Sequence, residues 1–399
     1  MRKTINIGDL GTIITGKTPP TTNKNYYGDY AVFIKPTDIS EHSKYTYETE
    51  EMYSKLAAEK YESSLIPKGA ICVPCIGTVG TKMTMAPCDC YTNQSINSII
   101  CNENYDNEYV YYLIKNFLPG LKAYNLGTAS GREYVSKSNF EKIELVAEQD
   151  KEIQKKIGVI LSRYDSLIEN YQKQIKLLEE AAQRLYKEWF INLHFPGHEN
   201  TNIIDGVPEG WEKKKVNSII ELQSGFAFKS STFDDNGTYK IVTIKNVKDG
   251  AFDGDNVSKI VAIPDKMPKH CILADGDILL SLTGNVGRVC IVNGKSYLLN
   301  QRVAKLATDY KAFTYCLFRS RDMFIEVNNL ANGAAQQNVS PIRIGEMKIL
   351  LPNSELLQEF ESIVFKSVAR IISLQSQLHL LTEARDRLLP KLMSGEIEI

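Results

Sequence analysis

The chain has 399 residues, of which 43% are hydrophobic and 24% charged. This is typical of a globular protein with two or three domains, each long enough to bury its own core. Lys and Arg (47) nearly balance Asp and Glu (48), so the net charge does not indicate a nucleic-acid or membrane partner. The sequence contains no secretion signal and no apolar run long enough to span a membrane. Its eight cysteines fall mostly in strand-like segments, so we expect a cytoplasmic protein.

Residues 11–20, GTIITGKTPP, fit the phosphate-binding pattern G-x-x-x-x-G-K-[ST]. That pattern needs a helix directly after the glycine loop, because the helix N-terminus holds the phosphates. Pro19 and Pro20 disfavour such a helix, and the preceding segment is too polar for a buried parallel strand. An ATPase or GTPase using Lys17 and Thr18 is therefore kept only as an alternative.

The sequence contains one internal repeat. LIPKGAICVPCIGTVGTKMTM (65–85) aligns with CILADGDILLSLTGNVGRVCI (271–291), and YAVFIKPTDI (30–39) aligns with YKIVTIKNVK (239–248). Five pairs share a constant offset of 207 residues: Gly69 and Gly276, Gly77 and Gly284, Gly80 and Gly287, Asn93 and Asn300, and Gln94 and Gln301. Such agreement indicates two copies of one structural unit.

The repeat also bears on the phosphate-binding pattern. Gly16 aligns with Gly225 of IIELQSGFAF, whereas Lys17 and Thr18 align with Phe226 and Ala227. The element common to both copies is a glycine turn, so the match to the phosphate-binding pattern is interpreted as accidental.

Each copy ends in a long helical pattern. Apolar residues between Ile153 and Trp189 follow 4-3 spacing with a stutter at Tyr171, and a similar stripe extends from Phe360 to Leu388. We expect the two helices to cover each other. Forty helical residues span about 60 Å, and residues 191–210, rich in Pro, Gly and Asn, would have to be almost fully extended to return that distance. The helices are therefore predicted to run antiparallel.

The predicted fold is α+β, with two mixed α/β domains at opposite ends of an antiparallel coiled coil. The predicted boundaries are residues 1–148 and 211–352 for the domains, 149–192 and 353–394 for the helices, and 193–210 for the linker.

No motif indicates catalysis. Cys72, Cys75, Cys88 and Cys90 have a spacing that a zinc site could use, but the second copy has Leu279, Leu282, Lys295 and Tyr297 at these positions. We expect these cysteines to be structural, and we expect no metal or other cofactor. The five histidines do not fall at ligand spacing, and no dinucleotide-binding, metalloprotease or serine-hydrolase motif is present.

The repeated loops are polar and rich in glycine. Their side chains are of the types that contact phosphates and base edges, and glycine permits a close approach of the backbone. The alternative is that these loops are ordinary solvated turns. Candidate DNA-binding residues are Lys17, Thr18, Lys35, Thr78, Lys82, Asn93, Gln94 and Arg132 in the first copy, and Phe226, Lys229, Lys245, Thr283, Asn285, Arg288, Asn300, Gln301, Gln336, Gln337 and Asn338 in the second.

Two kinds of DNA contact are expected from these candidates and from a nearby lysine run. Arg288 follows a glycine and has a planar guanidinium suited to guanine, whereas Lys213, Lys214 and Lys215 suit phosphates. Two related but divergent domains also suit a partner whose two halves differ in sequence, such as duplex DNA.

The order of these features resembles the specificity subunit of type I restriction-modification systems over essentially the whole chain. The resemblance rests on TGKTPP and SGFAF, PKGAICVPCIGTVG and ADGDILLSLTGNVG, the two Asn-Gln pairs, GAAQQNVS, VPEGWEKKKV and RDRLLPKLMSGEI. The first copy departs from it, since it has ELVAEQD where the family has a proline-ended strand, and GTASGRE lacks the Gln-Gln pair.

The resemblance implies a non-catalytic subunit that recognises double-stranded DNA. Each domain would be a target recognition domain for one half of a bipartite, asymmetric site. The helices would dock two methyltransferase subunits, which methylate adenine with S-adenosylmethionine, and restriction subunits would join them. A protein-binding coiled-coil scaffold without DNA binding remains a further alternative.

Overall fold

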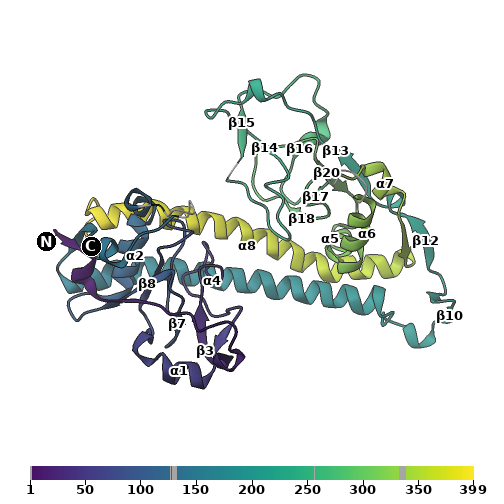
Figure 1. Cartoon of the computed structure of the whole chain (residues 1–399). Helices are drawn as coiled ribbons and strands as arrows, with labels where there is room; N and C mark the ends of the chain where they lie inside the picture. Colours follow the sequence, from purple (N-terminus) through teal and green to yellow (C-terminus); the bar gives the residue numbers. More distant parts are fainter. Residues whose placement is uncertain (1, 126, 128–132, 256, 332–337) are drawn as a thin grey trace. The chain divides into compact units, whose positions relative to one another are not determined.

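The computed structural model describes residues 2–125, 127, 133–255, 257–331 and 338–399 (Figure 1). The chain divides into two compact units. Unit 1 comprises Met1–Asn170 and Leu380–Ile399, and unit 2 comprises Tyr171–His379. Each of the two long helices, α4 (Lys151–Tyr186) and α8 (Ser354–Ser394), contributes to both units.

Unit 1 is built on an antiparallel four-stranded sheet in the order β2-β8-β5-β6. Its strands are β2 (Gly11–Thr15), β8 (Ile96–Cys101), β5 (Ile71–Pro74) and β6 (Thr84–Met85). A three-stranded sheet in the order β4-β3-β7 joins β4 (Met52–Tyr53), β3 (Tyr27–Ile34) and β7 (Tyr91–Thr92), and β1 (Arg2–Asn6) pairs with β9 (Glu144–Glu148). The short helices are α1 (Lys55–Lys60), α2 (Asn107–Phe117) and α3 (Lys137–Glu141).

Unit 2 repeats this arrangement. Its antiparallel sheet has the order β13-β20-β17-β18, with β13 (Glu221–Ser224), β20 (Val303–Ala307), β17 (Ile278–Ser281) and β18 (Val289–Ile291). A second sheet has the order β15-β14-β19-β16, with β15 (Ser258–Ile260), β14 (Tyr239–Val242), β19 (Tyr297–Leu299) and β16 (Ile272–Leu273). The strands β12 (Glu212–Lys215) and β21 (Lys348–Leu351) pair, and the helices are α5 (Lys311–Arg319), α6 (Arg321–Ala331) and α7 (Pro341–Gly345).

The equivalent strand orders confirm the α+β class and the internal repeat. One stretch of the predicted alignment is wrong by a single residue. The Asn93 N–H donates to the Ile34 carbonyl and the Asn300 N–H donates to the Val242 carbonyl, both at 3.1 Å. Ile34 therefore corresponds to Val242 rather than to Thr243, because equivalence is set by the pairing of parallel strands and not by matching letters.

Within each unit, α4 and α8 pack against each other in antiparallel directions. In unit 2 Gln174 contacts Arg370, and further along α4 the ring of Tyr186 lies 6.2 Å from that of Phe360. In unit 1 Asp165 pairs with Arg385 at 2.6 Å, while earlier turns of α4 share a core with Leu389 and Leu392. Burial of these apolar faces stabilises the helix pair.

The seam in α4 differs in part from the prediction. The buried side chains in unit 1 include Leu161, Asp165 and Ile168, whereas Leu167, one of the apolar residues in the predicted stripe between Ile153 and Trp189, is 45% exposed. The prediction counted only apolar residues, so it missed the polar Asp165 in the seam. Asp165 occupies the seam because Arg385 neutralises its charge there.

The segment after α4 is only partly irregular. A π-helical turn, Lys187–Ile191, ends the helix and buries both Trp189 and Phe190. A short hairpin follows, formed by β10 (Ile203–Ile204) and β11 (Val207–Pro208). Among the described residues, the helices are too short or too polar to cross a membrane. The domain and linker boundaries drawn from the sequence stay a prediction.

Candidate nucleic-acid interface

A close backbone contact explains why both copies have a glycine at the same place. A Cβ atom on Gly16 would lie 2.1 Å from the Thr92 carbonyl oxygen, and one on Gly225 would lie 2.2 Å from that of Asn300. No side chain can be accommodated at such distances without moving the backbone. In each unit, the loop after the first strand of the four-stranded sheet is therefore held against the turn that carries the Asn-Gln pair.

In unit 1, this contact brings four predicted residues together. The Lys17 N–H donates to the Thr92 carbonyl at 2.9 Å, and the Thr18 hydroxyl is hydrogen-bonded to Gln94. Asn93 shapes the turn, since its Oδ1 accepts from the Ser95 N–H at 3.0 Å.

The phosphate-binding hypothesis is wrong for this stretch. Residues 11–15, which would begin the phosphate loop, form strand β2, paired with β8. The Lys17 carbonyl accepts from the Tyr53 hydroxyl at 2.6 Å, and the next helical segment is a single 3-10 turn at Lys24–Tyr26. No helix N-terminus follows Thr18, so the backbone donors that would hold a phosphate are not formed.

Unit 2 gathers its predicted residues in the same way. The Phe226 N–H donates to the Leu299 carbonyl at 2.9 Å, and the Gln301 N–H donates to the Phe226 carbonyl at 3.0 Å. The loop between β17 and β18 joins this group, because the Leu282 N–H donates to the Arg302 carbonyl at 3.0 Å. Thr283 in that loop donates its hydroxyl to Oδ1 of Asn338 at 2.9 Å.

The corresponding loop of unit 1 carries Thr78. It is attached in the same manner, with the Cys75 N–H donating to the Ser95 carbonyl at 2.7 Å. Glu133 holds it from the other side, since its carboxylate accepts from the Val79 N–H at 3.2 Å. The Thr78 hydroxyl oxygen is buried, and the described residues provide no hydrogen-bond partner for it. In both units, three polar loops therefore meet at one edge of the four-stranded sheet.

The predicted lysines differ in their availability. Nζ of Lys35 lies 2.7 Å from Glu50 and 3.2 Å from Glu51. Burial lowers the pKa of Lys35, but hydrogen bonds to these carboxylates outweigh that effect and raise it above the ordinary value. Lys82 donates to the Ile39 carbonyl at 3.1 Å. Both side chains are engaged within the protein.

The lysines of unit 2 differ among themselves. Lys229 and Lys245 are exposed and form no ion pair with any described residue. In the predicted phosphate-binding run, Lys214 pairs with Glu212 at 2.8 Å and Lys215 with Glu346 at 2.5 Å. Lys229 and Lys245 are therefore better placed than Lys214 and Lys215 to contact a phosphate.

Three predicted residues, Arg132, Gln336 and Gln337, lie outside the described residues. Asn285 is exposed at the tip of the loop between β17 and β18, and Arg288 is half-buried at its base, where its N–H donates to the Ser281 hydroxyl at 3.0 Å.

The sequence reasoning missed two further residues at this edge. Arg302 is exposed directly after the Asn-Gln pair, where its cationic side chain was a usable signal. Asn328 of α6 donates to the Val286 carbonyl at 3.1 Å. That contact joins segments distant in sequence, so no local pattern indicated it.

The cysteine cluster does not have the chemistry of a zinc site. Cys72, Cys75 and Cys90 are buried while Cys88 is exposed. Burial raises the pKa of Cys72 to about 11 and that of Cys75 to about 12, which disfavours the thiolate that a metal needs. Within the described ranges, no three His, Cys, Asp or Glu side chains are grouped to hold a metal.

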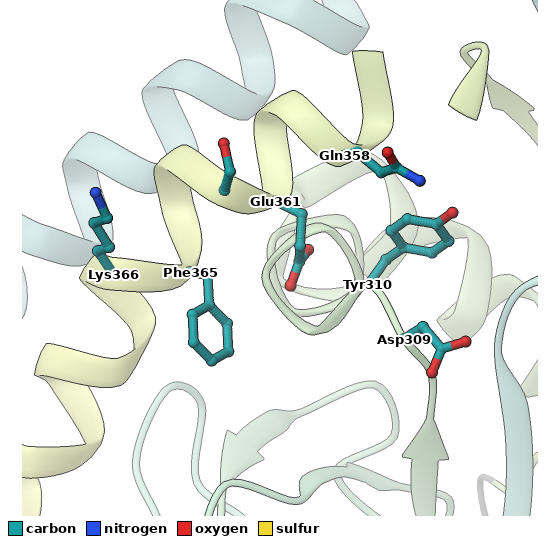
Figure 2. A pocket seen from close by; sticks show the side chains of 7 residues that line it. Asp309, Tyr310, Gln358, Glu361, Phe365 and Lys366 are labelled. Atoms are coloured by element: carbon teal, nitrogen blue, oxygen red, sulfur yellow. The ribbon is translucent and has the colours of Figure 1, made fainter. Parts of the chain in front are cut away.

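A surface hollow in unit 2 lies against α8 rather than at the polar loops (Figure 2). Its lining consists of Asp309, Tyr310, Gln358, Glu361, Ser362, Phe365 and Lys366. Glu361 points from α8 toward the start of α5, where its carboxylate accepts from the N–H groups of Ala312 (2.9 Å) and Phe313 (3.0 Å). Burial nevertheless raises the pKa of Glu361. This carboxylate caps a helix, so the hollow has a structural role.

The repeated sheets, the paired long helices and the polar loops define a class of DNA-specificity proteins. Residues 2–180 and 208–380 match the type I restriction modification DNA specificity domain. The match covers most of the chain, so the protein belongs to this family. It is a specificity subunit of a type I restriction-modification system, the recognition component rather than the catalytic one.

The chain is similar to the type I restriction enzyme MjaIX specificity subunit of Methanocaldococcus jannaschii, with 28% identity over 98% of this chain and 93% of that one. It is also 30% identical to the MjaVIII specificity subunit of the same organism, over 75% of this chain and 72% of that one. The crystal structure of the M. genitalium type I S subunit shares the fold, with a TM-score of 0.61, 17% identity, and coverage of 98% of this chain and 96% of that one.

Proposed function

We propose that this subunit binds a bipartite, asymmetric site on double-stranded DNA, with each unit contacting one half. The observation that carries the proposal is that equivalent loops meet at the same sheet edge in both units but carry different side chains, such as Thr78 and Asn285. Equivalent loops give both units the same way of approaching a base-pair edge, and different side chains give them different preferences.

The proposed recognition domains are residues 1–148 and 211–352. Replacing residues 211–352 by the equivalent segment of a relative should change one half of the recognised site and leave the other half unchanged. A change in both halves would show that the two domains do not act independently.

The proposed partners are two methyltransferase subunits and the restriction subunits of the complex, in the cytoplasm. Large apolar side chains exposed on the long helices support docking there: Val159 (47%), Leu167 (45%), Leu177 (54%), Ile363 (46%) and Phe365 (48%). Single exposed apolar residues are common on protein surfaces, but several on the same two helices indicate a contact with another protein.

The proposed spacing element is the helix pair. Adding four residues to α4 after Asn170, and four to α8 after His379, adds about 6 Å of rise and rotates each seam by about 40°. We expect the same two half-sites, separated by one or two more base pairs at about 3.4 Å each. An active complex that kept the original gap would show that the helices do not set it.

The central experiment is to co-express the chain with its methyltransferase subunit and to map methylated adenines across the host genome. We expect a two-part motif with a constant gap. Absence of any sequence-specific methylation by a stable complex would contradict the proposal.

A coiled-coil scaffold that binds only proteins is the remaining alternative. Gel shifts of the assembled methyltransferase complex at low and moderate salt distinguish the two functions, because a DNA-binding complex loses affinity steeply as salt rises. A scaffold would give no shift at either concentration.

A further inference from the structure

The turn between β19 and β20 holds an arginine where the loops of unit 2 meet. The Arg302 N–H donates to Oδ1 of Asn300 at 3.3 Å, and its carbonyl accepts from the Leu282 N–H at 3.0 Å. The preceding residue, Gln301, is bonded through its N–H to the Phe226 carbonyl. The backbone of Arg302 is thus fixed between the loops that follow β13 and β17.

The side chain of Arg302, in contrast, is available. It is exposed, and no described carboxylate forms an ion pair with it. Another arginine of the same unit, Arg319, is held by Asp249 at 2.7 Å and by Glu179 at 3.3 Å. A guanidinium without a carboxylate keeps all its donors for a ligand.

Both units have a cation at this junction, but it comes from a different loop in each. Arg302 corresponds to Ser95 in unit 1, where the Ser95 carbonyl makes the equivalent hydrogen bond to Cys75. Conversely, Phe226 corresponds to Lys17. Each unit therefore places one cationic side chain beside the same glycine contact, a lysine after β2 in unit 1 and an arginine before β20 in unit 2.

The two cations differ in what they can recognise. A lysine ammonium is a compact charge without a planar donor pattern, whereas a guanidinium can donate two parallel hydrogen bonds to O6 and N7 of guanine in the major groove. We propose that Arg302 recognises a guanine in the half-site contacted by unit 2. This inference rests on the proposed function.

The test uses the complete methyltransferase complex with the variants Arg302→Ala and Arg302→Lys. We expect each variant to lose roughly ten- to hundredfold preference for guanine at one position of one half-site. The lysine variant should retain more overall affinity than the alanine variant because it keeps the charge. The readout is the genome-wide distribution of methylated adenines, together with binding to duplexes that differ only at that position.

One matched variant serves as the control. Arg343→Ala removes another exposed arginine of unit 2, on α7. It should leave base preference unchanged. Thermal unfolding of each variant establishes that the fold is retained.

Two results would overturn the inference and are distinguishable from each other. If Arg302→Ala weakens binding equally at all sequences and lowers the salt dependence by about one phosphate contact, Arg302 binds the backbone instead. If the wild-type complex neither binds nor methylates DNA, the proposed function itself fails, and the inference with it.

Discussion

The two long helices pack through a buried ion pair in unit 1 and through apolar residues at the equivalent positions of unit 2. In unit 1, Asp165 accepts hydrogen bonds from Arg385 at 2.6 Å and from the Tyr112 hydroxyl at 2.5 Å, and both Asp165 and Arg385 are buried. The equivalent positions of unit 2, read from the matching burial patterns, hold Val368, Ala182 and Cys316, all within one apolar core.

The difference teaches that the polar layer is not required for the two helices to pack. A buried ion pair gains little net stability over well-packed apolar residues, because desolvation offsets its attraction, whereas an unpaired buried charge is costly. Asp165 and Arg385 each need the other to compensate a buried charge, whereas the packing of the two helices does not need the pair. Because either charge is costly when it is buried alone, the pair restricts which residues can face each other across this seam.

Removing one member of the pair should have the largest effect. Arg385→Ala leaves the Asp165 carboxylate buried with only the Tyr112 hydroxyl, and we expect a loss of about 3–5 kcal/mol in the free energy of unfolding. Urea unfolding combined with hydrogen exchange in α4 and α8 measures it. Arg387→Ala, which removes an exposed i,i+4 pair on the same helix, is the matched control and should change stability by less than about 0.5 kcal/mol.

Replacing the polar seam residues of unit 1 by apolar ones should restore most of the stability that Arg385→Ala loses. We expect the triple variant Tyr112→Phe, Asp165→Val, Arg385→Leu to come within about 1–2 kcal/mol of the wild type, since it removes both buried charges of the pair and keeps most of the volume. The same unfolding experiment measures it. A triple variant as unstable as Arg385→Ala would mean that the seam of unit 1 needs its polar layer.

The glycine contacts should behave alike in the two units. Gly16→Ala and Gly225→Ala each force a Cβ against a carbonyl, and we expect about 1–3 kcal/mol of destabilisation and a displaced loop. Gly77→Ala is the control, because Gly77 has φ +85° with nothing within 4 Å, so only the left-handed backbone costs energy, about 1 kcal/mol. Equal effects at all three positions would refute the steric explanation.

Replacing a lysine in unit 1 and one in unit 2 should affect the salt dependence of DNA binding differently. Lys245→Ala should lower the slope of log affinity against log salt by about one, because its exposed side chain has no described carboxylate partner. Lys35→Ala should change the slope much less, since Glu50 and Glu51 already neutralise it. Gel shifts across a salt series with the assembled complex provide the measurement. Identical slopes for the two variants would contradict this assignment.

The features that could be predicted from the sequence are those for which both copies have the same residue at equivalent positions. Glycines and the Asn-Gln pairs occur where backbones approach closely, and that requirement acts on residue type directly, as at Gly16 and Gly225. The long helices were predictable because their apolar spacing extends over many turns.

The features that could not be predicted depend on partners distant in sequence. From the sequence alone, Asp165 is expected on the surface, and only the structure shows Arg385, 220 positions away, opposite it. Lys35 is likewise expected to contact a phosphate, but Glu50 and Glu51 neutralise its charge. The one-residue shift at Ile34 arises because strand pairing fixes register, which sequence similarity between two divergent copies does not report.

The turn at Asn300–Arg302 is fastened mainly through backbone atoms. The groups that hold it, including the N–H of Gln301, the carbonyl of Arg302 and the carbonyl of Phe226, are present whatever side chains these residues carry. Gln301 and Arg302 can thus be exchanged with little penalty to folding, while Gly225 beneath them cannot. The backbone of the turn is therefore fixed while its side chains can vary. A library randomised at positions 301 and 302 should consist mostly of folded subunits. Such a library offers a direct route to subunits with new target sequences.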